Sequence, residues 1–119
     1  MKPAVVYEWN ALPVDEPMAK LSRRRVMGEK MMISEIRLQK GCEVPLHNHE
    51  NEQFSCVLSG WLRFTTTFEG KSFQHDVRAG EVIHLPSQVP HSAFAMEDTL
   101  VLDLFSPPSA TTGIDRAHG

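Results

Sequence analysis

The chain has 119 residues, of which 41% are hydrophobic and 23% are charged, and its formal net charge at pH 7 is −3. This size and composition predict one globular domain with one hydrophobic core, and they exclude a disordered chain. The weakly acidic balance offers no basic field for nucleic acid or anionic lipid, and no apolar run approaches the roughly 20 residues of a membrane helix.

The N-terminal residues lack an apolar signal core, so we expect a cytoplasmic protein whose two cysteines are free thiols. No Cys-x-x-Cys pair is present, which argues against cysteines as zinc ligands. Cys56 alternates with Phe54 and Leu58, and we interpret it as a small core residue of a strand.

Residues 1–22 are expected to form an irregular N-terminal arm, because Pro3, Pro13 and Pro17 interrupt it. Residues 5–7 could add a short strand, for example to a partner subunit. Beyond the arm, β-branched and aromatic runs alternate with turn residues. Strands are predicted over residues 23–27, 31–38, 44–47, 53–58, 61–68, 71–77, 81–85, 91–95 and 99–105.

Short strands at nearly even spacing, with no helical periodicity over any long window, predict an all-β barrel or jelly roll in a single domain. Residues 109–119 follow two prolines and are expected to be a loose C-terminal tail. The run Arg23, Arg24 and Arg25 is typical of a solvated strand edge. One of these arginines could instead reach a pocket mouth and hold a substrate carboxylate.

Two histidines one residue apart, His47 and His49, precede one of the predicted strands. On an extended strand both side chains would point to the same face. Gln53 follows on the next strand, and His91 comes after a proline-rich turn. Imidazole binds divalent transition metals, so we interpret these four residues as converging on one metal ion inside the barrel. A solvated strand residue is the alternative for any one of these histidines alone.

Three further histidines stand outside this constellation. His75 and His118 are expected to be ordinary solvated residues. His84 precedes Pro86 and could face the pocket, although a packed or exposed histidine is the more common case.

Two motifs in this order resemble those of the cupin superfamily. The first has a glycine, a histidine pair, an acceptor residue and a closing glycine, here Gly41, His47, His49, Gln53 and Gly60. The second has a glycine, a proline and a histidine, here Gly80, Pro86 and His91. The resemblance covers about residues 30–105 and implies a double-stranded β-helix, the cupin jelly-roll barrel.

Three positions depart from the usual cupin pattern. Gln53 stands where a glutamate is usual, Gln88 where a glycine is usual, and Ala95 where an asparagine is usual. Only the first affects the metal. The Glu52-Gln53 pair and the ending from Asp103 to Pro108 resemble one branch of small single-domain cupins, which includes enzymes that linearise unsaturated uronates in pectin degradation.

That resemblance implies a metal held by three histidines and a glutamine, here His47, His49, Gln53 and His91. It also implies that Asp103 and Phe105 take part in catalysis. The neutral amide of Gln53 would leave a divalent ion its full formal charge, which favours Lewis-acid chemistry over oxygen chemistry. The side chain of Glu52 should point away from that of Gln53. The sequence does not choose among nickel, zinc, iron, manganese and copper.

Asp103 interrupts an apolar strand, where a lone carboxylate needs a partner, a raised pKa or a wet cavity. We interpret it as a general acid or base beside the metal. The alternative is a structural aspartate bonded to backbone or to an arginine. Phe105 shares a face with Asp103 and could line the pocket or belong to the core.

These residues lead to one functional hypothesis and two alternatives. The hypothesis is a metal-dependent isomerase or ring-opening enzyme that acts on a small carbohydrate-derived acid, such as an unsaturated uronate. The first alternative is a metal-dependent dioxygenase or polyketide cyclase. The second is a non-catalytic cupin that binds a sugar or another ligand. We expect a polar or acidic small-molecule substrate, no nucleic-acid or membrane partner, and a homodimer, because similar small cupins commonly pair.

Overall fold

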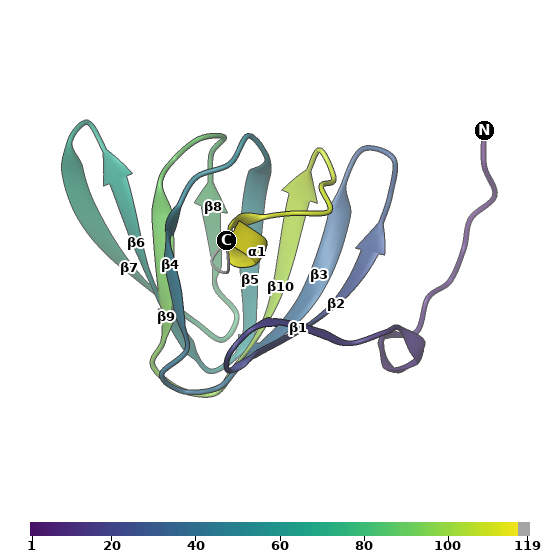
Figure 1. Ribbon diagram of the computed structural model, residues 1–119, viewed down its shortest axis with the longest axis horizontal. Coiled ribbons are helices and arrows are strands. Elements are labelled where there is room, and N and C mark those ends of the chain that lie inside the picture. The colour runs from purple at the N-terminus through teal and green to yellow at the C-terminus, as the bar shows by residue number, and fades with distance from the viewer. Residues whose placement is uncertain (117–119) are drawn as a thin grey trace.

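The computed structural model describes residues 1–116, which form two antiparallel sheets that face each other (Figure 1). The first sheet has the strand order β1 (Asp15–Met18), β2 (Leu21–Met27), β3 (Met32–Leu38), β10 (Thr99–Ser106), β5 (Glu52–Ser59) and β8 (Val82–Leu85). The second has the order β4 (Glu43–His47), β9 (His91–Ala95), β6 (Trp61–Phe68) and β7 (Lys71–Arg78). Two short helices complete the described chain, η1 (Trp9–Ala11) and α1 (Gly113–Arg116).

The chain crosses between the two sheets repeatedly. It passes from β3 in the first sheet to β4 in the second, returns to β5, and crosses again for the β6–β7 hairpin. The same alternation continues through β8, β9 and β10. This winding is that of a jelly roll and confirms the predicted all-β cupin barrel.

Alternation along the strands separates an inner face from an outer face. Strand β10 buries Val101, Asp103 and Phe105, and the residues between them are only partly buried. Across the sheet, inward residues form rows, and the row at one end is wholly aliphatic whereas the next two contain polar side chains. Ile36, Val101 and Val57 make an aliphatic row, Ser34, Asp103 and Ser55 the next, and Met32, Phe105 and Gln53 the third. This difference gives the barrel one dry part and one part suited to chemistry.

The predicted strands are correct to within two residues at each end, but the side assigned to Cys56 is wrong. Ser55 and Val57 point into the core, whereas Cys56 is half-buried on the outer face beside the exposed Phe54 and Leu58. Both faces of β5 carry apolar side chains, so alternation alone did not identify the inner one. The cysteine itself is a free thiol, as predicted.

The expected irregular arm contains regular structure. Strand β1 pairs with β2, although Pro17 lies within it. An edge strand tolerates proline, because one side of its backbone has no partner strand. Residues 5–7 form no strand, and the N-terminal arm extends away from the barrel (Figure 1).

The expected loose tail is also partly ordered. Helix α1 lies between the two sheets and packs against β4 and β1 (Figure 1). Thr112 and Ile114 are buried there. The ordering depends on tertiary contacts, which the local sequence pattern does not reveal. His118 lies outside the described residues. In the part of the chain described, no helix is long and apolar enough to cross a membrane.

Candidate metal centre

Three predicted ligands, His47, His49 and His91, gather at the polar end of the barrel. His47 ends β4 and lies directly opposite His91, the first residue of β9. The ring centroids are 4.3 Å apart for His47 and His91, 5.0 Å for His49 and His91, and 5.6 Å for His47 and His49. One nitrogen from each ring lies within 4.8 Å of the other two, so the three histidines could hold a metal ion.

The backbone after β4, rather than strand alternation, brings the histidine pair together. Strand β4 ends at His47, and His49 lies in the following loop. The ring of His49 is turned toward the cavity by a bond from its Nδ1 to the carbonyl of Asn51, at 2.9 Å. His47 and His49 therefore do not share the face of one strand, although the sequence suggested that they would. Their rings nevertheless lie close together, as predicted.

All three imidazoles have the same tautomer. Nδ1 of His47 bonds Pro45 O at 2.8 Å, Nδ1 of His49 bonds Asn51 O, and Nδ1 of His91 bonds Val89 O at 2.9 Å. Because a carbonyl oxygen only accepts, each Nδ1 carries the proton and each neutral ring keeps a lone pair on Nε2. This arrangement fixes ring orientation in metal sites.

His91 supplies a direct test of whether a cation fits. Its Nε2 atom is buried and has no hydrogen-bond partner among the described residues. Burial, together with a smaller effect of the neighbouring His47 and His49, lowers the pKa of His91 from 6.5 to about 4, although the bond to Val89 acts to raise it. The ring is therefore neutral at physiological pH, with a buried lone pair that a metal ion would satisfy.

Gln53, the predicted fourth donor, lies beside this cluster. Its Nε2 donates to Ser55 Oγ at 2.9 Å, which leaves its Oε1 3.0 Å from Nε2 of His49. When His49 is neutral, both of these atoms carry lone pairs, so their approach is unfavourable unless a cation lies nearby. Three imidazole nitrogens and one amide oxygen form a donor set that suits a divalent transition metal.

Asp103 is linked to the same donor set through Ser55. Ser55 Oγ donates to Asp103 Oδ1 at 2.6 Å, so Gln53, Ser55 and Asp103 form a continuous chain of hydrogen bonds. Burial raises the pKa of Asp103 from 3.8 to about 6, although the bond from Ser55 acts to lower it. Neither a backbone group nor an arginine bonds this carboxyl group among the described contacts, which argues against a purely structural role.

Phe105 packs beside His49, with ring centroids 5.8 Å apart and planes at 67°. It lines one cavity together with all four predicted ligands and Asp103. Among the lining residues, sequence reasoning missed Thr112 and Ile114. It also missed Ser55, although period-two alternation from Gln53 places Ser55 on the same face.

His75 and His84 do not line this cavity. His84 is exposed, stacks on Phe54 and bonds Glu52, whose carboxylate points away from Gln53 as expected. His75 bonds Thr66 Oγ1 at 2.8 Å. The arginine run is not a solvated edge, because β2 lies between β1 and β3 and Arg23 is only 3% exposed.

Comparison with known proteins supports the class that the fold and the histidines define. Residues 34–106 match the cupin domain family. The oxalate decarboxylase OxdC of Bacillus subtilis is 32% identical over 77 residues, which cover 64% of this chain and 20% of that protein. The chain therefore spans only about a fifth of that relative's length.

Solved structures agree with the fold. KdgF from a Halomonas species superposes with a TM-score of 0.81 at 22% identity, covering 91% of this chain and 97% of that one. An RmlC-like cupin from Shewanella frigidimarina gives 0.80 at 22% identity, covering 91% and 95%. A B. subtilis oxalate decarboxylase described for its Mn(II) centres gives 0.80 at 26% identity, covering 88% and 30%.

An antiparallel jelly roll with a three-histidine cluster in its cavity defines the class of metal-binding cupins. The chain belongs to the cupin domain family, whose match covers more than half of its residues.

Proposed function

We propose that this protein is a metal-dependent enzyme that isomerises or opens the ring of a small carbohydrate-derived acid, such as an unsaturated uronate. The observation that carries the proposal is the joint presence of a histidine cluster with inward lone pairs and a buried carboxyl group with a pKa near neutrality. These two features supply an electrophile site and a proton-transfer group in the lining of one cavity.

His47, His49, His91 and Gln53 would hold the metal, with Nε2 of each ring and Oε1 of the amide as donors. A divalent ion there would supply Lewis acidity toward a substrate oxygen. The metal would be a divalent transition metal such as nickel, zinc, iron or manganese, which this donor set suits. Gln53 adds no negative charge, which keeps the site more electrophilic than a glutamate would.

Asp103 would transfer the proton. Ser55 holds Oδ1, so proton exchange with substrate would take place at Oδ2. A pKa of about 6 lets the group donate or accept a proton near neutral pH. Phe105 would shape the pocket and exclude water. The structural similarity to KdgF supports only the fold of this protein. The proposed chemistry rests on the residues described above.

The experiment combines metal analysis with turnover of an unsaturated galacturonate, followed by loss of its ultraviolet absorbance. We expect His91→Ala to lose bound metal and turnover together. We expect Asp103→Asn to keep its metal and lose turnover at least about 100-fold, the range of a lost general acid or base. His75→Ala is the matched control and should retain both. An undiminished rate in Asp103→Asn would remove Asp103 from the mechanism.

Two other functions give different outcomes in the same assays. A dioxygenase would consume oxygen after iron reconstitution, whereas an isomerase would not. A binding cupin would show a ligand-dependent rise in melting temperature without any product.

A further inference from the structure

The C-terminal segment, residues 112–116, occupies the mouth of the cavity. Ile114 is 8% exposed and belongs to the hydrophobic core, and Thr112 is 3% exposed. Gly113 lies against the ring of His47: a Cβ atom at this position would come within 2.0 Å of His47 Nε2. The segment thus covers the nitrogen through which His47 would bind a metal, and a substrate approaching from this side would meet it first.

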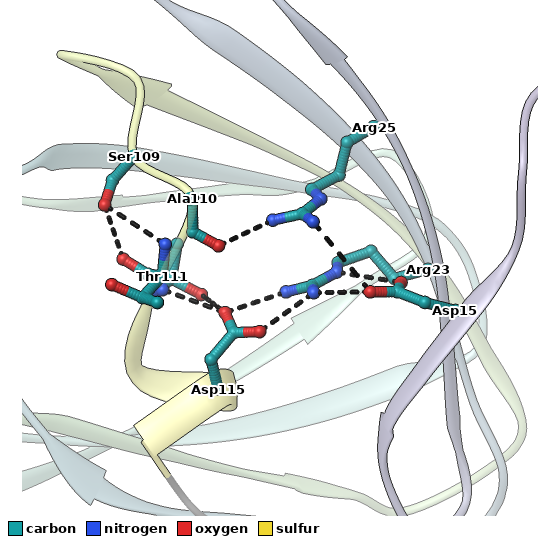
Figure 2. A network of polar contacts seen from close by, with 8 residues as sticks. Asp15, Arg23, Arg25, Ser109, Ala110, Thr111 and Asp115 are labelled. Atoms are coloured by element: carbon teal, nitrogen blue, oxygen red, sulfur yellow. Dashed lines mark hydrogen bonds and ion pairs between the residues drawn. The ribbon is translucent and has the colours of Figure 1, made fainter.

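The same segment is tied to a buried arginine (Figure 2). Arg23 Nη1 donates to Asp115 Oδ2 at 3.0 Å, and Nη2 donates to Asp115 Oδ1 at 2.9 Å. On its other side Arg23 donates to both carboxylate oxygens of Asp15, at 3.1 and 2.7 Å. Asp115 therefore occupies one of two carboxylate positions on a single guanidinium group.

Thr112 and Ile114 line the cavity, whereas Arg23 and Asp115 lie behind this segment, outside the lining. We propose that Arg23 binds the substrate's carboxylate once residues 112–116 leave, and that this segment acts as an internal ligand with Asp115 in the place of that carboxylate. The inference deepens the proposed function and rests on it for the location of the reaction. When an acidic sugar binds, its carboxylate replaces that of Asp115 and the segment leaves the mouth.

The chemistry of the segment supports this assignment. A guanidinium group recognises a carboxylate through two parallel hydrogen bonds, which a neutral ligand cannot reproduce. Ile114 places an apolar group in the cavity and Asp115 an acid beside it, so the segment has the polarity of a small organic acid. Asp15 keeps Arg23 paired when Asp115 departs, so opening does not leave a buried charge without a partner.

The position of the arginines also suits a ligand that reaches the metal centre. Arg23 lies in the row of Ile36 and Val101 across three adjacent strands, and the row of Asp103 is the next inward row along the sheet. Strand spacing and the rise per residue make the backbone separation of Arg23 and Asp103 roughly 12 Å, which an arginine side chain and a small sugar acid together can span. Arg25 donates to the carbonyl of Ala110 at 2.8 Å, so it holds the chain that leads into the segment (Figure 2).

The test is binding of D-galacturonate to the full-length protein by titration calorimetry, with D-galactose as the matched neutral sugar. Asp115→Ala removes the internal carboxylate, so we expect galacturonate to bind about tenfold more tightly than to the wild type, with galactose unchanged. Gly113→Ala should have the same effect, because its Cβ cannot fit beside His47. Equal affinity in wild type and Asp115→Ala, or an equal gain for both sugars, would overturn the proposal.

Two further variants isolate the arginine. Asp15→Asn removes the partner on the far side of Arg23, leaves Asp115 in place, and should not strengthen acid binding. Arg23→Gln alone would leave the carboxylates of Asp15 and Asp115 without the cation between them. The double variant Arg23→Gln with Asp115→Asn removes one of these negative charges together with the positive one and is used instead. We expect this double variant to bind galacturonate no better than galactose. A retained preference for the acid would exclude Arg23 as its binding residue.

Hydrogen exchange separates this inference from the proposed function, because it needs no turnover. Galacturonate should accelerate exchange of the amides in residues 113–115 of the wild type, whereas galactose should not. If the segment is displaced but no substrate is turned over, the inference about Arg23 is supported and the proposed reaction is contradicted. If an unsaturated uronate is turned over but the segment is not displaced, the proposed reaction is supported and the inference about Arg23 is contradicted.

Discussion

Asp103 is a carboxyl group in the interior of the barrel, and its environment predicts how stability depends on pH. Burial raises its pKa from 3.8 to about 6, so the folded protein holds this proton more tightly than the unfolded chain. The associated stability is fully present below pH 3.8 and is lost as the pH rises through about 6. Above that range the ionised group costs on the order of 3 kcal/mol.

We therefore expect Asp103→Asn to stabilise the metal-free protein by about 2–3 kcal/mol at pH 7.5 and to have little effect near pH 4. The measurement is urea denaturation of chelator-treated protein across this pH range. Ser55→Ala is the companion variant: it removes the bond that lowers the pKa of Asp103, so it should shift the pH dependence upward. A constant difference between Asp103→Asn and wild type at all pH values would contradict the assigned pKa.

Gln53 connects the candidate metal centre to Asp103. The role of its neutral side chain can be tested by replacing the amide nitrogen with oxygen, as in Gln53→Glu. Gln53→Glu supplies a negative oxygen, so we expect at least tenfold slower loss of metal to a chelator. The glutamate cannot donate to Ser55 Oγ, and it reduces the net charge at the metal, so turnover should fall. Unchanged metal retention would show that residue 53 does not bind the ion.

Gly60 is the residue at which β5 gives way to β6, and the chain there passes from one sheet to the other. Its φ is +94°, and a Cβ atom would lie 2.4 Å from Asp98 O and 2.5 Å from Thr99 Oγ1. The close approach of the β9–β10 turn therefore requires a residue without a side chain. The glycine of the first motif thus has a packing role, apart from the metal.

A matched pair of variants tests this role. We expect Gly60→Ala to cost about 3 kcal/mol or more, because it combines backbone strain with a clash. Gly70, in the β6–β7 hairpin, also has a positive φ of +75°, but nothing lies within 4 Å of its Cβ position. Gly70→Ala should therefore cost only about 1 kcal/mol. Similar losses in urea denaturation would contradict the role of the Asp98 contact.

The whole molecule has one outer sheet face that is unusually apolar. Outward residues of β5, β8 and β10 include the exposed Phe54, Leu58 and Val82 and the half-buried Leu102 and Leu104. These strands are adjacent in the order β10–β5–β8, so the side chains form one patch. A patch without charge at its centre is complementary to itself, and we propose that a second copy of this chain covers it.

Substitution of an exposed residue of this patch tests the dimer. Leu58→Lys places a charge at a position that is 50% exposed in the single chain, so folding should be unaffected while self-association weakens at least tenfold. Phe94→Lys, at a 40% exposed position on the outer face of the other sheet, is the matched control. Light scattering during size-exclusion chromatography measures both. A dimer that survives Leu58→Lys, or a wild-type monomer, would rule out this interface.

The sequence by itself predicted the barrel and the donors of its candidate metal centre. Period-two alternation and glycine turns are local properties, so the positions of all strands except β1 followed from the pattern. The two histidine motifs fixed which donors would meet, because a jelly roll brings the ends of β4, β5 and β9 to the same place. Asp103 was identifiable because a lone acid in an apolar strand is costly without a special environment.

Only the tertiary structure decided which face of β5 is buried, how the histidine rings are oriented, and what covers the cavity. Cys56 and Val57 are both apolar, so their sides depend on the opposite sheet. The rings are held by carbonyl groups whose direction follows from the loops. Arg23 and Asp115 are 92 residues apart, and their pairing exists only because folding brings β2 and α1 to one opening. Contacts of that range leave no local pattern, since neither residue's neighbours in the chain determine its partner.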